Sequence, residues 1–165
     1  MSSTTSSLRI VSHNVNRKYD LTSNSLELFR EDTDIFFIQE PPWRIVRRTV
    51  STSLREGDPV VGPPTHPDWL IFFRRPAPGV DWTLESERPR VITYVHRRLS
   101  HLRPTFRTDI VNHRDVSLLS LFGQGESHLL NVYNDPGTAA ASVWIRDNIQ
   151  RLPGLVYMGG DFNVE

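Results

Sequence analysis

The residues best suited to chemistry stand near the end of the chain, where the run Leu-Val-Tyr-Met-Gly-Gly at 155–160 leads to Asp161 and Asn163. Side chains two apart on a strand point to the same side, so Asp161 and Asn163 should face one pocket while Phe162 turns into the core. An acid beside an amide suits a metal-bound phosphate and its attacking water, and the glycines would let such a ligand approach the backbone. A strand that simply ends in a polar turn gives the same tripeptide, so both interpretations stay open.

Three further apolar runs also end in polar side chains, at Asn14, Glu40 and Tyr133. Glu40 follows a strongly apolar run and precedes two prolines, so it either binds a hard cation at a strand end or is solvated beside a turn. Asn14 shares a face with Asn16 if the strand continues, or else only caps a turn. The plainer role for Tyr133 is a core aromatic residue whose hydroxyl meets water.

The strands that must position these residues follow from hydrophobic periodicity. Residues 34–39 should form a central strand, because four adjacent apolar residues imply burial on both faces. Further strands are expected at 8–11, 69–73, 91–95, 106–111, 117–122, 129–133 and 155–163. Turns are expected at 76–79 and at 112–115.

Three segments are expected to be helical. Residues 22–30 should form a short helix that has Ser and Asn caps and packs Leu26 and Phe29 against the sheet. A basic helix is expected at 44–56. Thr138 should cap a third helix, which Pro153 and Gly154 end. Its apolar face, expected to be core, consists of Ala141, Trp144, Ile145, Ile149 and Leu152.

Composition sets outer limits on the class of protein. The 165 residues suit one domain, and the start lacks a signal peptide, so residues 1–7 should be a disordered tail before a single domain at 8–165. The absence of cysteine favours an intracellular protein of the nucleus or cytoplasm, and no apolar run is long enough to span a membrane. All but one of the 19 basic residues are Arg, which suits phosphate partners or reflects codon usage equally well.

The motifs together resemble a known family. They are Ser-His-Asn-Val-Asn-Arg at 12–17, Ile-Gln-Glu-Pro-Pro-Trp at 38–43, Asn-Val-Tyr-Asn-Asp-Pro at 131–136 and Gly-Gly-Asp-Phe-Asn at 159–163. In this order they resemble the endonuclease/exonuclease/phosphatase superfamily, which has the DNase-I-like fold. Together with the segment 88–121, they are most similar to the endonuclease domain of fungal LINE-like retrotransposons without long terminal repeats.

The resemblance implies an α/β fold, a DNase-I-like four-layered αββα sandwich, and Mg²⁺-dependent hydrolysis of phosphodiester bonds in DNA. Glu40 would bind Mg²⁺ or Mn²⁺ with Asn14 beside it. Tyr133 and Asn163 would contact the scissile phosphate. Asp161 would orient or activate the attacking water.

One departure from the family pattern lowers the activity we expect. Family members continue past Gly-Asp-Phe-Asn to a Ser-Asp-His motif that supplies a general base, whereas this sequence ends at Glu165. We therefore expect a truncated domain with impaired activity, and none of the histidines is assigned as the base. We also expect self-association or pairing with the absent half, because the strands at 35–38, 118–121 and 129–132 would have an uncovered apolar face.

Two other functions remain open. One is a phosphatase of the same superfamily. The other is a catalytically dead nucleic-acid-binding remnant, in which basic side chains would contact phosphates without cleavage. These side chains are Arg44, Arg47, Arg48, Arg74 and Arg75.

Overall fold

The computed structural model describes residues 7–49, 58–75, 77–78 and 88–163. The expected disordered tail, except Ser7, and both ends of the expected turn at 76–79 lie outside the described residues. Within the described residues, no helix is both long and apolar enough to cross a membrane.

The elements alternate between strands and a few short helices. In chain order they are β1 (Ile10–Asn14), α1 (Tyr19–Leu28), β2 (Ile35–Gln39), β3 (Arg44–Thr49), β4 (Asp58–Gly62), β5 (Trp69–Phe72), β6 (Val91–His96), η2 (Arg97–Leu102), β7 (Thr105–Phe106), β8 (Val116–Phe122), β9 (Glu126–Tyr133), α2 (Ala140–Asn148), η3 (Ile149–Arg151) and β10 (Leu155–Asp161).

The strands form a mixed α+β fold with two four-stranded mixed sheets and a separate hairpin. One sheet has the order β1-β2-β6-β5, the other has the order β10-β9-β8-β7, and β3 pairs with β4. The pairs β1–β2 and β9–β10 are parallel, and all the others are antiparallel. β2 lies inside its sheet and is buried along its whole length, so the prediction of a central strand there is confirmed.

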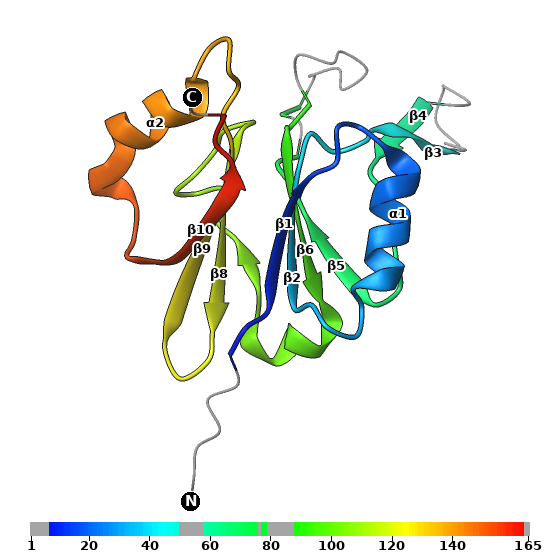
Figure 1. The fold of residues 1–165 in the computed structure, drawn as a ribbon, viewed down its shortest axis with the longest axis horizontal. Coiled ribbons are helices and arrows are strands. Elements are labelled where there is room, and N and C mark those ends of the chain that lie inside the picture. The colour runs from blue at the N-terminus through cyan, green and yellow to red at the C-terminus, as the bar shows by residue number, and fades with distance from the viewer. Residues whose placement is uncertain (1–6, 50–57, 76, 79–87, 164–165) are drawn as a thin grey trace, which may run out of the picture.

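The two sheets lie face to face and each carries one α-helix on its outer side (Figure 1). Three apolar clusters hold these layers together. Leu26 of α1 and Phe29 at its C-cap pack against one sheet, and Ala141 and Trp144 of α2 pack against the other. Between the sheets, the side chains of Ile35, Phe37, Val95, Leu119 and Leu129 share a third cluster. In each sheet, side chains on one face therefore pack against the other sheet, and side chains on the opposite face pack against a helix.

A buried hydrogen bond also joins the sheets. Gln39 of β2 donates from Nε2 to Oδ1 of Asn131 in β9 at 2.8 Å and to Oγ of Ser12 at 3.1 Å. Asn131 in turn donates from Nδ2 to the carbonyl oxygen of Ile92 at 2.9 Å. Because an unpaired buried amide costs free energy, this chain of bonds favours one register between the sheets.

Several predicted elements differ from those observed. The basic helix expected at 44–56 is wrong, because its described part forms strand β3 paired with β4. The strand expected at 106–111 ends at Phe106, where pairing with β8 stops. Thr138 does not cap α2: Ala139 occupies the N-cap position, and Oδ1 of Asn134 accepts from the backbone N–H of Ser142 instead.

Two further expectations about helical residues are wrong. α1 begins at Tyr19 after Lys18, so the expected Ser and Asn caps lie inside the helix. Ile149, expected in the core, is 54% exposed because it lies in η3 beyond the end of α2.

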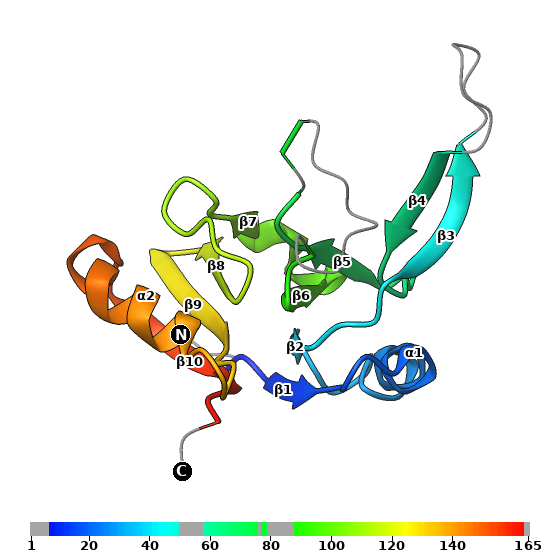
Figure 2. The same cartoon turned by 90° about the horizontal axis from the view of Figure 1, so that it is seen from above.

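The apolar faces expected to lie uncovered are in fact covered. The apolar residues of 35–38, 118–121 and 129–132 are at most 2% exposed, because the two sheets cover each other and the helices cover the outer faces. The exposed apolar side chains lie elsewhere, among them Val156 and Met158 of β10. β10 lies beside β1, and each is an edge strand of its own sheet (Figure 2).

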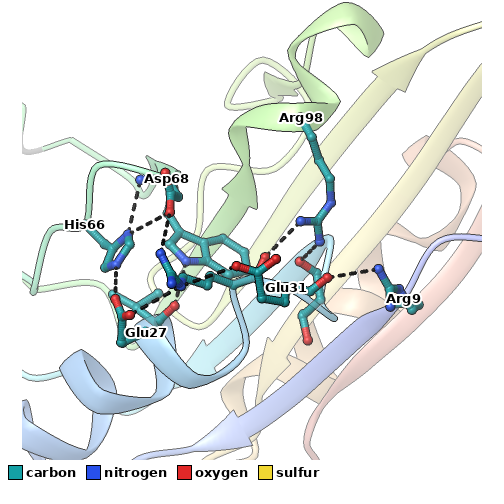
Figure 3. A network of polar contacts seen from close by, with 10 residues as sticks. Arg9, Glu27, Glu31, His66, Asp68 and Arg98 are labelled. Atoms are coloured by element: carbon teal, nitrogen blue, oxygen red, sulfur yellow. Dashed lines mark hydrogen bonds and ion pairs between the residues drawn. The ribbon is translucent and has the colours of Figure 1, made fainter.

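The ion pairs around Asp34 and Glu27 lie at the amino-terminal end of β2 and stabilise the fold there (Figure 3). Arg98 donates to Oδ1 of Asp34 at 2.7 Å, while the backbone N–H of Arg9 donates to its Oδ2 at 2.9 Å. Burial acts to raise the pKa of Asp34, but these hydrogen bonds hold it below its ordinary value. His66 contacts Glu27 at 2.8 Å. Glu40 follows the opposite end of β2, so this network is separate from Glu40.

Candidate functional site

The carboxyl ends of four strands meet at one end of the molecule, the upper end in Figure 1. β1 runs parallel to β2, and β9 runs parallel to β10. Asn14, Tyr133 and Asp161 are the last residues of β1, β9 and β10, and Glu40 directly follows β2. Both sheets therefore contribute polar side chains to the same end of the fold.

Asn14 joins two carboxylates that come from different sheets. Its Nδ2 donates to Oε2 of Glu40 at 2.9 Å and to Oδ2 of Asp161 at 2.7 Å. Its Oδ1 accepts from the backbone N–H of Asn16 at 2.8 Å, which fixes the side chain. The predicted convergence of Asn14, Glu40 and Asp161 is thus observed, across sequence separations of 26 and 147 residues.

The backbone of Glu40 is held in a conformation that non-glycine residues rarely adopt. Its φ is +48°, which costs about 1–2 kcal/mol for an L-residue. Two backbone bonds hold it there: its N–H donates to the carbonyl oxygen of Arg90 at 2.9 Å, and its own carbonyl oxygen accepts from Arg17 at 2.8 Å. Strain of this kind is common at binding sites, where it fixes the direction of a side chain.

Tyr133 lies beside Glu40 at this end of the fold. The residue is 7% exposed, and its hydroxyl lies in the field of the Glu40 carboxylate. Burial, followed by the negative charge of Glu40, raises the pKa of Tyr133 to about 12. The hydroxyl therefore stays protonated near neutral pH and remains a hydrogen-bond donor.

Arg90 supports this arrangement and was not assigned a role from the sequence. Its guanidinium donates to both carboxylate oxygens of Asp115, at 2.6 and 2.5 Å, and also bonds Asp135. It lies 4.9 Å from the centre of the Tyr133 ring. The hydrogen bonds that Arg90 donates to Asp115 raise the pKa of Arg90, and the bond that Arg90 donates to Asp135 lowers the pKa of Asp135. The only sequence signal was the Arg-Pro-Arg-Val that precedes β6.

Asn163 departs from its predicted place. β10 ends at Asp161, and Asn163 has a φ of +42°, so the two-residue alternation does not extend to it. Its Nδ2 donates to the carbonyl oxygen of Asn134 at 2.8 Å, so it braces the turn after β9. The prediction that Asp161 and Asn163 face one pocket is therefore wrong in this structure. Phe162 does pack into the core as predicted.

The glycines before Asp161 serve packing. A Cβ placed on Gly160 would lie 1.9 Å from the carbonyl oxygen of Val132 in β9, and its φ is +153°. The residue allows β10 to approach β9 closely. Gly160 therefore has a structural role, and the expectation that the glycines admit a ligand stays a prediction.

The arginines predicted to contact phosphates lie in several places. Arg44 is exposed and stacks 3.0 Å from the centre of the Tyr19 ring, and Arg75 lies 4.4 Å from that of Phe73. Arg74 is half-buried. Arg47 and Arg48 belong to β3, but their side chains lie outside the described part of the structure.

The residues at the strand ends supply carboxylate and amide oxygens, the ligand types that a hard divalent cation prefers. Among the described residues, no group of three or more His, Cys, Asp or Glu side chains is arranged so that it could hold a metal ion. Mg²⁺, however, is commonly bound by one or two carboxylates with several waters and substrate phosphate. The amide N–H₂ of Asn14 now lies between Glu40 and Asp161 and offsets their repulsion, and a half-turn of this amide would present its oxygen to the same space.

Comparisons with protein-family models and with curated proteins find no match to this chain.

Proposed function

We propose that this chain is a Mg²⁺- or Mn²⁺-dependent phosphodiesterase acting on DNA, an endonuclease of the retrotransposon type with a DNase-I-like four-layered sandwich fold. The observation that carries this proposal is the convergence of Glu40 and Asp161 on the amide of Asn14. The two acids come from different sheets, and the motifs around them are those that carry the resemblance.

Glu40 and Asn14 would hold the cation, and Asp161 would accept a hydrogen bond from the attacking water and orient it. A bound divalent cation supplies Lewis-acid polarisation of the phosphoryl oxygen. The rigid backbone turn at Glu40 keeps its carboxylate directed at Asn14. The main change on binding would be the half-turn of the Asn14 amide, which would give up the bond from the backbone N–H of Asn16.

The hydroxyl of Tyr133 would donate a hydrogen bond to an oxygen of the scissile phosphate. Its raised pKa keeps this proton in place at neutral pH. Arg90, fixed by Asp115 and Asp135, packs against the tyrosine ring and holds it in position. Asn163 would reach the phosphate only after giving up its bond to the carbonyl oxygen of Asn134.

The histidines do not complete the site as a general base. Five of the six histidine side chains form hydrogen bonds with groups other than Asn14, Glu40 and Asp161. The sixth histidine, His13, is exposed. A general base contributes about 10² to 10⁴ in rate. We therefore expect slow cleavage, with most of the rate acceleration coming from Asp161 and the cation.

The test is nicking of supercoiled plasmid in Mg²⁺ and in EDTA. Wild type should nick slowly in Mg²⁺ only, and Glu40→Gln and Asp161→Asn should abolish nicking. The matched control is Glu31→Gln, which removes a carboxylate that is 79% exposed, and it should nick like wild type. DNA binding without any metal-dependent nicking would refute the proposed hydrolysis and favour a nucleic-acid-binding protein instead.

A further inference from the structure

The side chains of the candidate site are divided between the two sheets. Asn14 and Glu40 lie at the ends of β1 and β2, whereas Tyr133 and Asp161 end strands of the other sheet. A shift of one sheet along the other by a single residue is about 3.3 Å. Such a shift would break the 2.7 Å bond from Asn14 to Asp161. The site therefore depends on how the two sheets are held relative to each other.

Apolar packing between the sheets gives way to buried amides near the site. Ile35 and Phe37 of β2 share the apolar cluster between the sheets with Leu129 of β9. The next residues on the same faces of these strands are Gln39 and Asn131, because side chains two apart share a face. These two amides are 1% and 0% exposed. A buried polar layer therefore separates the apolar cluster from the strand ends.

The amides join one strand of the second sheet to three strands of the first. Nε2 of Gln39 donates to Oδ1 of Asn131 at 2.8 Å and to Oγ of Ser12 in β1 at 3.1 Å. Nδ2 of Asn131 donates to the carbonyl oxygen of Ile92 in β6 at 2.9 Å and, at 3.4 Å, to that of Ile38 in β2. Hydrogen bonds are directional, and a buried amide that loses its partner costs free energy, so a displaced arrangement of the sheets is disfavoured.

This link lies directly behind the side chains of the site. Gln39 precedes Glu40, and Asn131 lies two residues before Tyr133. The pairing of β9 with β10 places Asp161 beside Tyr133. At about 3.3 Å per residue, the bond between the two amides is about 3–7 Å along the strands from these three residues. A link so close to the strand ends controls their relative position more directly than packing at the far end of the sheets.

We propose that Gln39 and Asn131 are positioning residues of the candidate site. Their bond holds the two sheets so that Asp161 reaches the amide of Asn14, and with it the carboxylate of Glu40. The inference rests on the proposed function for the chemistry of the site. Stability alone does not require such a pair, because replacing both partners of a buried hydrogen bond by apolar groups of the same shape is nearly neutral.

The variants remove the link while keeping its shape. Gln39→Met removes the donor, and the double variant Gln39→Met with Asn131→Leu replaces both amides by apolar side chains of similar size. The matched control is Ser120→Ala, which removes a different buried hydrogen bond. That bond joins Oγ of Ser120 to Nδ1 of His128 at 2.8 Å, on neighbouring strands of a single sheet. Urea unfolding shows which variants keep a cooperative fold.

The first measurement needs neither metal nor DNA. Exchange of the Asn14 Nδ2 protons with water is followed by NMR in EDTA, and their signals are identified by their absence in Asn14→Asp. In wild type this group donates to two carboxylates, so exchange should be slow. In the double variant it should be at least about tenfold faster, with a smaller increase in Gln39→Met. Ser120→Ala should match wild type.

Two further measurements connect the link to the proposed function. Mn²⁺ affinity should fall about tenfold in the double variant, as is typical when residues that orient metal ligands are lost. The kcat for plasmid nicking should fall about tenfold or more while KM is unchanged, because the buried amides position the site without touching DNA. Ser120→Ala should keep both values even if its urea midpoint falls. A merely structural role for the pair would give this control's behaviour.

Exchange of the Asn14 protons at the wild-type rate in a folded double variant would overturn the proposal. Faster exchange with unchanged Mn²⁺ affinity, in a wild type that binds Mn²⁺, would overturn it as well. If the double variant does not fold, Gln39→Met decides by the same criteria. Loss of the fold in both variants would assign the pair to stability and reject a positioning role.

The outcome is separable from that of the proposed function. A wild type without Mn²⁺ binding and without nicking would reject the proposed function, while faster exchange in the double variant would still support the positioning of Asp161 by the amides. Metal-dependent nicking by wild type, with unchanged exchange in the double variant, would reject the positioning role alone.

Discussion

Replacing Asn14 by aspartate tests whether a cation can take the place of the Asn14 amide between the carboxylates of Glu40 and Asp161. In wild type, the N–H₂ group donates to two carboxylates, Glu40 and Asp161. Asn14→Asp removes both bonds and places a third negative charge between the two acids. Hydrogen bonds to charged groups contribute about 1.5–3 kcal/mol each. Because the site is only partly buried, we discount their sum and expect a loss of about 2–4 kcal/mol in the free energy of unfolding without metal.

Mg²⁺ should reverse this loss. Three carboxylates form a tighter oxygen cage than two, and a ligand at about 100 times its Kd stabilises the folded state by about 2.7 kcal/mol. In EDTA, the Tm of Asn14→Asp should fall by about 4–16 °C, at about 2–4 °C per kcal/mol for a domain of this size. In excess Mg²⁺, most of this fall should be regained, whereas wild type should shift little.

The assay is thermal unfolding in EDTA and in Mg²⁺, with Asn16→Asp as the matched control. Asn16 is exposed and two residues away, so the same change of charge there should alter Tm little in either condition. If Asn14→Asp lost the same Tm with and without Mg²⁺, the carboxylates would not form a cation site, and the reasoning would be refuted.

Three further predictions follow from the same end of the fold. Arg90→Ala should cost about 3 kcal/mol in urea unfolding, because buried Asp115 loses its bidentate partner and keeps Arg114 at 3.9 Å, whereas Arg107→Ala, whose aspartate partner is 62% exposed, should cost under about 1 kcal/mol; equal losses would contradict this. The raised pKa of Tyr133 predicts stability that is complete below about pH 10 and declines as pH rises to about 12, a decline that Tyr133→Phe should reduce; identical pH profiles would be evidence against it. Met158→Lys should lower self-association in sedimentation, because Met158 is 49% exposed on edge strand β10; a monomeric wild type would contradict that prediction.

Local pattern was enough to predict the elements that carry the site. The buried run of β2 and the positions of Asn14, Glu40 and Asp161 at strand ends follow from apolar runs that stop at polar residues. Their convergence needs only parallel pairing within each sheet and the packing of the sheets on each other.

The features that could not be predicted from the sequence depend on contacts between distant segments. Arg44–Thr49 looks helical in isolation, but pairing with β4 makes it a strand. Asn163 follows the two-residue alternation only if β10 continues, and its bond to Asn134 shows that it does not. Arg90 could not be singled out among many arginines, because its importance comes from Asp115 and Asp135, which lie 25 and 45 residues away.

The central claim is that Glu40 holds one divalent cation, with Asn14 beside it and the carboxylate of Asp161 close by, and titration with Mn²⁺ tests it most directly. Free Mn²⁺ is followed by electron paramagnetic resonance, so bound ion is counted without any substrate. Wild type should bind one ion weakly, Glu40→Gln and Asp161→Asn should each reduce the affinity at least about tenfold, and Glu31→Gln should leave it unchanged. Equal affinity in wild type, Glu40→Gln and Asp161→Asn would contradict the account.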